Sequence, residues 1–179
     1  MRWHKSVDSL RKLGVSDVAP LDPERVMKAL SSHRVKFVMI GALAARMHGF
    51  PRFTADVDIT PAHDKQNLEH LAAALSELDA KVYTESVPEG LPFDCSASAL
   101  GRARMWNLVT SAGRVDIAFE PSGTDGYSDL AEHAEKFKAF GVQFLVASLD
   151  DIIRSKESTG RPKDEEDVVL LRALKRMKA

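Results

Sequence analysis

Three aspartates lie in two segments with the alternating pattern of β-strands. Asp56 and Asp58 stand two positions apart in ADVDIT (55–60), where the apolar residues Val57 and Ile59 alternate with them. Side chains two apart on a strand point to the same face, so the two carboxylates share a face and repel each other. Asp116, in RVDIAF (114–119), also lies between two apolar residues. If the two strands are neighbours, the three carboxylates converge and favour a hard cation such as Mg²⁺.

A cluster of this kind indicates phosphoryl-transfer chemistry. Two Mg²⁺ ions about 3.5 to 4 Å apart can hold the attacking and the leaving oxygen of an in-line displacement. An isolated Asp-x-Asp on a strand is more often the solvated face of an edge strand. The second Asp-bearing strand and a glycine turn upstream favour the metal-binding interpretation.

The glycine turn joins a buried strand to a short helix. VKFVMIG (35–41) is rich in β-branched and aromatic residues, and ALAARMHG (42–49) has the composition of a helix that ends at Gly49. Because Gly41 has no Cβ, the backbone N–H groups of the Gly41-Ala42 turn can approach a phosphate.

The remaining elements predict a mixed sheet covered by helices, an α/β (α+β) fold. Helices are expected over 22–32 and 67–78, at YSDLAEHAEKF (127–137), and from Ser148 and Pro162 onward. Strands are expected over 81–85 and 142–147, with a hairpin over 105–120. SVPEGLPFD (86–94) is expected to be a loop.

Bulk composition is that of one ordinary globular domain. The 179 residues are 44% hydrophobic and 28% charged, and we expect N-terminal helices over about 1–33, a catalytic core over about 34–147 and C-terminal helices over about 148–179. Cys95 is the single cysteine, and no stretch approaches the roughly 18 apolar residues of a membrane span. A cytoplasmic protein without membrane association is therefore predicted.

The sequence lacks the motifs of several other enzyme classes. The formal net charge of −1 gives no general support for nucleic-acid binding, and the sequence contains neither an HExxH zinc motif nor a GK[ST] phosphate loop. His48, beside Gly49, is better explained as a residue at a helix end than as a nucleotide contact.

Three segments resemble the nucleotidyltransferase superfamily related to DNA polymerase β, in particular its minimal AbiEii-like branch of bacterial toxin–antitoxin and abortive-infection systems. They are IGALAARMHGFPRFTADVDI, GRVDIAFEP and VASLDDIIRSKESTGRPKDEEDVVLL, in the expected order and over somewhat under half of the chain. The resemblance implies a nucleotidyltransferase fold with a mixed sheet flanked by helices.

The resemblance also implies roles for individual residues. Asp56, Asp58 and Asp116 would bind metal, with Asp116 as the third, catalytic carboxylate. The remaining implied positions are the turn that receives the triphosphate, Gly41 and Ala42, the phosphate contacts Lys156 and Arg161, and the residues that orient those two, Asp164 and Asp167. Family members usually carry Gly-Gly or Gly-Ser at the turn, so Ala42 removes a possible hydroxyl contact.

Arg52 is a further candidate for nucleotide binding. If the strand begins early, Arg52 and Thr54 point to the same face as Asp56 and Arg52 can reach a γ-phosphate or an acceptor strand; a surface role is equally compatible. The acids after Pro162 are also what an ordinary helix N-terminus carries. The sequence therefore leaves structural alternatives open for Arg52 and for Asp164.

The expected activity is Mg²⁺-dependent transfer of a nucleoside monophosphate from an NTP to an acceptor hydroxyl, with release of pyrophosphate. By resemblance, the acceptor is the 3′ end of tRNA and the protein is a toxin with an antitoxin partner. Two alternatives remain open: a small-molecule acceptor such as an aminoglycoside, or a protein side chain, with the same chemistry; and a catalytically silent nucleotide-binding module.

Overall fold

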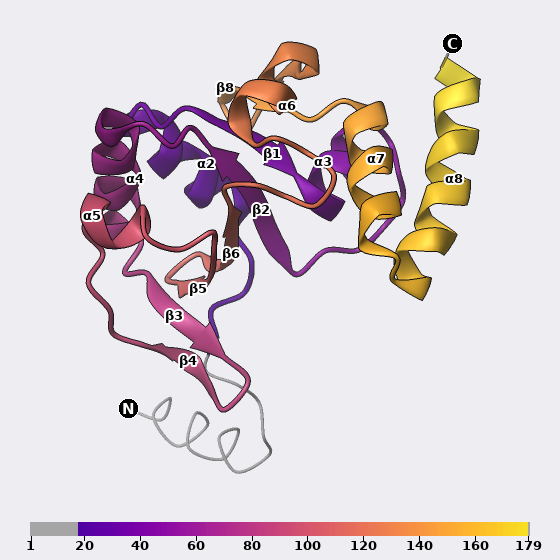
Figure 1. The fold of residues 1–179 in the computed structure, drawn as a ribbon. Helices are drawn as coiled ribbons and strands as arrows, with labels where there is room; N and C mark the ends of the chain where they lie inside the picture. The colour runs from indigo at the N-terminus through magenta and orange to yellow at the C-terminus, as the bar shows by residue number, and fades with distance from the viewer. Residues whose placement is uncertain (1–17, 179) are drawn as a thin grey trace, which may run out of the picture.

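A mixed sheet of eight strands runs through the part of the chain that the structure describes, residues 18–178 of a computed structural model (Figure 1). The strand order is β4-β3-β5-β6-β2-β1-β8-β7. The strands are β1 (Phe37–Ile40), β2 (Asp56–Pro61), β3 (Lys81–Thr84), β4 (Val87–Leu91), β5 (Met105–Thr110), β6 (Gly113–Ala118), β7 (Glu135–Ala139) and β8 (Val142–Val146). The pairs β1/β8 and β2/β6 are parallel, and the other neighbours are antiparallel.

Seven helices surround this sheet in the described residues. They are α2 (Pro23–Ser32), α3 (Gly41–Met47), α4 (Lys65–Glu77), α5 (Ala97–Leu100), α6 (Tyr127–His133), α7 (Leu149–Thr159) and α8 (Pro162–Lys178). In Figure 1, α4 and α5 lie on one side of the molecule and α7 and α8 on the other. The predicted mixed sheet flanked by helices is confirmed.

The alternation in β2 separates a packed face from a polar one. Val57 and Ile59 are fully buried in the hydrophobic core, beside Val115 and Ile117 of β6. Because successive side chains point to opposite faces, Asp56 and Asp58 lie on the other face of the same strand. The core therefore fixes the direction of the carboxylates.

The C-terminal helices begin where the sequence predicts. Ser148 caps α7: the Asp151 N–H donates to the Ser148 hydroxyl oxygen at 3.1 Å, and that hydroxyl donates to Asp151 Oδ2 at 2.8 Å. α8 begins at Pro162. Proline lacks a backbone N–H, but an N–H in the first helical turn has no acceptor within the helix, so no hydrogen bond is lost. These caps set the ends of two helices that border the candidate site.

Two predicted segments are wrong, and one short helix was not predicted. The segment 127–137 does not form one helix: α6 ends at His133, and Glu135 begins β7, which pairs with β8. The predicted loop 86–94 contains β4, an edge strand that tolerates Pro88 because one of its sides needs no backbone donor. The short helix α5 was not predicted.

The predicted N-terminal helical region, 1–33, is described only from residue 18, and α2 occupies its last part; residues 1–17 lie outside the described residues. Within residues 18–178, none of the helices combines the length and the apolar character that crossing a bilayer requires.

Candidate active site

The turn between β1 and α3 brings the backbone directly against a carboxylate. Gly41 adopts φ +68°, and a Cβ built there would lie 2.1 Å from Asp58 Oδ2. A left-handed conformation and this close approach both require glycine. The first turn of α3 and the Asp58 carboxylate therefore share one small volume.

Strand register places the three predicted aspartates together. Asp58 of β2 pairs with Asp116 of the parallel strand β6 and with Ile40 of β1. Asp56, Asp58 and Asp116 line the same cleft, which has a volume of about 350 Å³. The Thr54 hydroxyl donates to Asp56 Oδ1 at 2.9 Å and fixes that side chain. Asp56, Asp58 and Asp116 therefore line one cleft, and their roles in metal binding and catalysis stay predictions.

Burial and mutual repulsion make Asp58 and Asp116 difficult to ionise. Burial, followed by the charges of Asp56 and Asp116, raises the pKa of Asp58 to about 7. Burial is also the largest cause that raises the pKa of Asp116, and the neighbouring charge of Arg114 opposes that rise. A group of acids with raised pKa values in a cleft is typical of a functional site.

Arg114 is the cation nearest to this cluster on β6. Its Nη2 lies 3.4 Å from Asp116 Oδ2, and its guanidinium carbon lies 4.0 Å from the centroid of the Tyr83 ring. Its buried Nε has no hydrogen-bond partner among the described residues. Arg114 therefore neutralises part of the negative charge beside Asp116.

The donor set fits magnesium in its chemistry. Within residues 18–178, no three His, Cys, Asp or Glu side chains are already arranged as a set of metal ligands. Magnesium, however, is usually held by one or two carboxylates together with substrate phosphates and waters, not by a complete protein cage. The neighbouring charges of Asp56 and Asp116 contribute to the raised pKa of Asp58, and a divalent cation at this position would relieve that repulsion.

Lys156 of α7 approaches the cleft from the other side, held by two aspartates of α8. Its Nζ donates to Asp164 Oδ1 at 2.7 Å and to Asp167 Oδ2 at 2.8 Å. The Thr159 hydroxyl donates to Asp164 Oδ2 at 2.7 Å. Hydrogen bonds and the charge of Lys156 hold the pKa of Asp164 below its ordinary value even though burial, the largest single influence, acts to raise it. The lysine is thereby fixed in one position at the cleft.

Most of the predicted site residues meet in this cleft. The lining includes Gly41, Ala42, Asp56, Asp58, Asp116, Lys156, Arg161 and Asp164. Asp167 lies behind Lys156, almost wholly buried. Asp164 and Asp167 were expected to orient both Lys156 and Arg161. They contact Lys156, and among the described residues neither carboxylate forms an ion pair with Arg161.

Arg52 lies elsewhere than expected. β2 begins at Asp56, so Arg52 belongs to the preceding loop and not to the strand face that carries the aspartates. Its Nη1 pairs with Asp167 Oδ1, and Arg52 is not among the described residues that line the cleft. In this structure Arg52 is a partner of α8, not a residue that faces the carboxylates.

Sequence reasoning missed several residues of the site. Arg114 stands two positions before Asp116, so the same strand alternation identifies it as a neighbour on that face. Ser155 and Thr159 are one helical turn apart on α7 and both line the cleft, as do Thr124 and Lys163. His48, by contrast, is buried and is not among the described residues that line the cleft; its Nε2 lies 2.8 Å from the Ala147 carbonyl oxygen.

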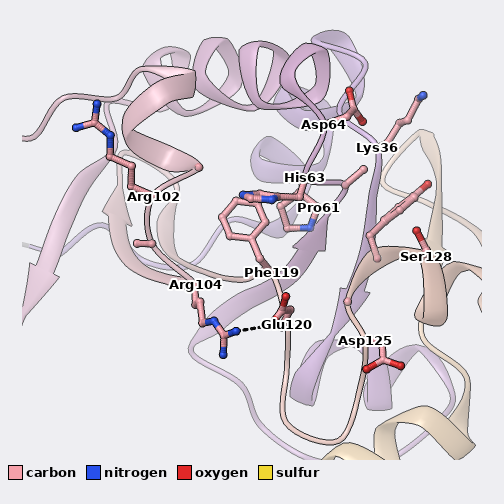
Figure 2. A pocket seen from close by; sticks show the side chains of 15 residues that line it. Lys36, Pro61, His63, Asp64, Arg102, Arg104, Phe119, Glu120, Asp125 and Ser128 are labelled. Atoms are coloured by element: carbon pink, nitrogen blue, oxygen red, sulfur yellow. Dashed lines mark ion pairs between the residues drawn. The ribbon is translucent and has the colours of Figure 1, made fainter.

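A second cavity, of about 480 Å³, lies beyond the ends of β2 and β6 (Figure 2). His63 and Phe119 form part of its wall, with ring centroids 4.6 Å apart. Its acids Asp64, Glu120 and Asp125 lie apart in Figure 2, and Glu120 pairs with Arg104 at 3.1 Å. Although larger, this cavity has no convergent set of carboxylates, so the cleft around Asp58 is the better candidate for catalysis.

Comparison with known proteins supports the fold. Neither protein-family models nor characterised protein sequences match the chain. Among solved structures, it is similar to a proposed nucleotidyltransferase from Thermotoga maritima, with a TM-score of 0.52 and 18% identity, over 84% of this chain and 93% of the other. The protein therefore has the mixed α/β fold of that nucleotidyltransferase-like structure.

Proposed function

We propose that the protein is a Mg²⁺-dependent nucleotidyltransferase that moves a nucleoside monophosphate from an NTP to an acceptor hydroxyl. The observation that carries the proposal is the meeting of Asp56, Asp58 and Asp116 in one cleft with a glycine turn and Lys156. The likeness of the fold to a proposed nucleotidyltransferase supports the same chemistry.

In this proposal, different residues of the cleft bind the metal ions and the phosphates. Asp56, Asp58 and Asp116 would hold two magnesium ions, which supply positive charge to the phosphates and to the attacking oxygen. The backbone N–H groups of Gly41 and Ala42 donate to phosphate oxygens. Lys156 and Arg161 line the same cleft and supply further positive charge to the triphosphate.

The transfer step is an in-line displacement at the α-phosphorus. The acceptor oxygen forms a bond to this phosphorus, the bond to the bridging oxygen of the β-phosphate breaks, and pyrophosphate leaves with that oxygen. Asp116 accepts the proton of the acceptor hydroxyl. Its pKa is raised by burial, which brings the carboxylate closer to the proton affinity that a general base needs.

The resemblance of the sequence to AbiEii-like toxins leads us to propose the 3′ end of tRNA as the acceptor, with a cognate antitoxin as partner. These two assignments rest on that resemblance alone, whereas the proposed cytoplasmic location rests on the single cysteine and on the lack of a long apolar stretch. The formal net charge of −1 adds no support for an RNA acceptor.

A transfer assay tests the proposal. The protein is incubated with each NTP labelled at the α-phosphate, Mg²⁺, and separately total tRNA, a panel of aminoglycosides and cell-lysate protein. We expect labelled RNA with the wild type and with Asp79→Asn, an exposed control carboxylate, and none with Asp58→Asn. Label only on a drug or a protein contradicts the tRNA assignment. NTP binding without any transfer contradicts the enzyme and favours a silent nucleotide-binding module.

A further inference from the structure

The outer side of α8 carries an unusual concentration of exposed apolar side chains. Figure 1 shows α8 beside α7 at the edge of the molecule. Its inner side is buried through Asp164, Asp167, Val168 and Leu171. Six large hydrophobic residues are exposed in the described part of the chain, and three of them lie on α8: Val169, Leu170 and Met177, at 67%, 57% and 84% exposure. Such a cluster on one helix indicates an interaction surface.

Two of these residues, Leu170 and Met177, stand seven positions apart, which is the spacing of a helix–helix seam, whereas Val169 lies about 100° around the helix from Leu170. Glu166, Leu170, Ala173 and Met177 follow one another at steps of four, three and four residues, which places them on one stripe of the helix, as at the a and d positions of a coiled coil. This stripe lies roughly opposite to the buried side at 100° per residue. Ala173, at its centre, is small enough to let a second helix approach closely.

The charges of α8 identify the partner. The acids Glu165 and Glu166 lie near its start, and Arg176 lies near its end beside the stripe. Arg172 and Lys175 already pair with Glu157 and Asp150, whereas Glu165, Glu166 and Arg176 form no ion pair with another described residue. An antiparallel helix of the same sequence would place Arg176 beside these acids at both ends.

We propose that two copies of the chain associate through α8, antiparallel and around a twofold axis. Leu170 of each copy would pack near Ala173 of the other, so the surface is complementary to itself, as a twofold contact requires. The electrostatic interaction between the two antiparallel helix dipoles also stabilises the dimer. From Glu166 to Met177 the stripe is only about 17 Å long, so the dimer is expected to be reversible. The proposal does not depend on the activity of the cleft.

Sedimentation velocity of the full chain over a wide range of concentrations tests the proposal. We expect the average mass of the wild type to rise with concentration toward twice that of the monomer, and Leu170→Glu to remain monomeric. Leu91→Glu, which changes an exposed leucine of the edge strand β4, serves as the matched control and should behave as the wild type. Circular dichroism checks that both variants are folded.

Charge reversal separates an antiparallel contact from a general apolar association. Glu166→Arg and Arg176→Glu, each alone, bring like charges together and should shift association to higher concentration by at least tenfold. The double variant exchanges both signs in each copy and should restore the behaviour of the wild type. A chain that stays monomeric at every concentration overturns the proposal. A dimer that Leu170→Glu leaves intact, or a double variant no better than the single ones, also overturns it.

Discussion

At the scale of single residues, the Gly41 and Asp58 pair is the most constrained feature of the cleft. Replacement of Gly41 by alanine places a Cβ within 2.1 Å of Asp58 Oδ2 and forces a β-carbon into φ +68°. The left-handed conformation alone costs about 1–2 kcal/mol. We expect Gly41→Ala to lose more stability than that, because the carboxylate must also move.

Gly160 provides the matched control for this substitution. It has a similar φ of +60°, and a Cβ there would have no heavy atom within 4 Å. Urea unfolding of Gly160→Ala therefore measures the conformational cost alone. Equal losses of unfolding free energy in the two variants would show that Gly41 and Asp58 are not in close contact.

The buried carboxylate of Asp58 makes stability depend on pH. Its pKa is raised from 3.8 to about 7 in the folded protein, so the folded chain keeps a proton that the unfolded chain loses. The resulting stabilisation is complete below pH 3.8 and is lost as the pH rises through about 7. At about 1.4 kcal/mol per tenfold change, the loss is no more than about 4.5 kcal/mol.

Asp58→Asn tests this dependence, because asparagine cannot ionise. In the presence of a chelator, the unfolding free energy of Asp58→Asn should exceed that of the wild type by an amount that grows between pH 4 and pH 7 and then levels off. Asp79→Asn corrects for the general effect of removing one negative charge. A difference between Asp58→Asn and the wild type that stays constant over this range would contradict the assigned pKa.

Residue-level prediction succeeded where the pattern was local. The alternation in β2 and β6 places Asp56, Asp58 and Asp116 on one face, and the register of two parallel strands brings those faces together. The pairing of Arg52 with Asp167 was not predicted, because the two residues lie 115 positions apart in the sequence. The local alternation of polar and apolar residues cannot predict a contact between residues so far apart in the sequence.

At the scale of secondary structure, α7, α8 and the loop before β2 are joined by one buried carboxylate. Asp167 is 1% exposed and accepts hydrogen bonds from both Lys156 and Arg52. Removal of one partner from a buried ion pair costs about 3–5 kcal/mol, because the remaining charges lose their compensation.

Asp167→Ala should therefore lower the unfolding free energy by about 3–5 kcal/mol. Urea unfolding followed by circular dichroism measures the change. Glu69→Ala, at an exposed position of α4, provides the control and should change stability by no more than about 0.5 kcal/mol. A loss below about 1 kcal/mol in Asp167→Ala would mean that the three elements are not held together through this side chain.

Element prediction was reliable where a periodic pattern or a cap was present, as at α2, α4 and the start of α7. It failed at Glu135, where helix-compatible residues become a strand because β8 supplies the pairing partner. It failed again at β4, where Pro88 suggested a loop but the strand lies at the edge of the sheet. In both segments tertiary pairing overrides local preference.

At the scale of the whole molecule, the sheet and the C-terminal helices act as two walls of one cleft. The sheet supplies the carboxylates through β2 and β6, and α7 supplies Lys156 opposite to them. The helical wall carries the cations Lys156, Arg161 and Lys163 and also the acids Asp151 and Asp164. Cations that face the carboxylates of the sheet suit a ligand that carries both a divalent cation and phosphates. Asp164 and Asp167, which hold Lys156, both lie on the inner side of α8. The outer side of α8 therefore remains available for association.

The most direct test of this account is the binding of Mn²⁺, as a stand-in for Mg²⁺, measured by electron paramagnetic resonance with a non-hydrolysable NTP analogue. Samples without protein correct for metal bound by the nucleotide alone. We predict two ions per chain in the wild type and in Asp79→Asn, and an affinity at least about tenfold weaker in Asp58→Asn and Asp116→Asn. Metal binding that is absent in the wild type, or equal in all four proteins, would contradict a metal-dependent site in this cleft.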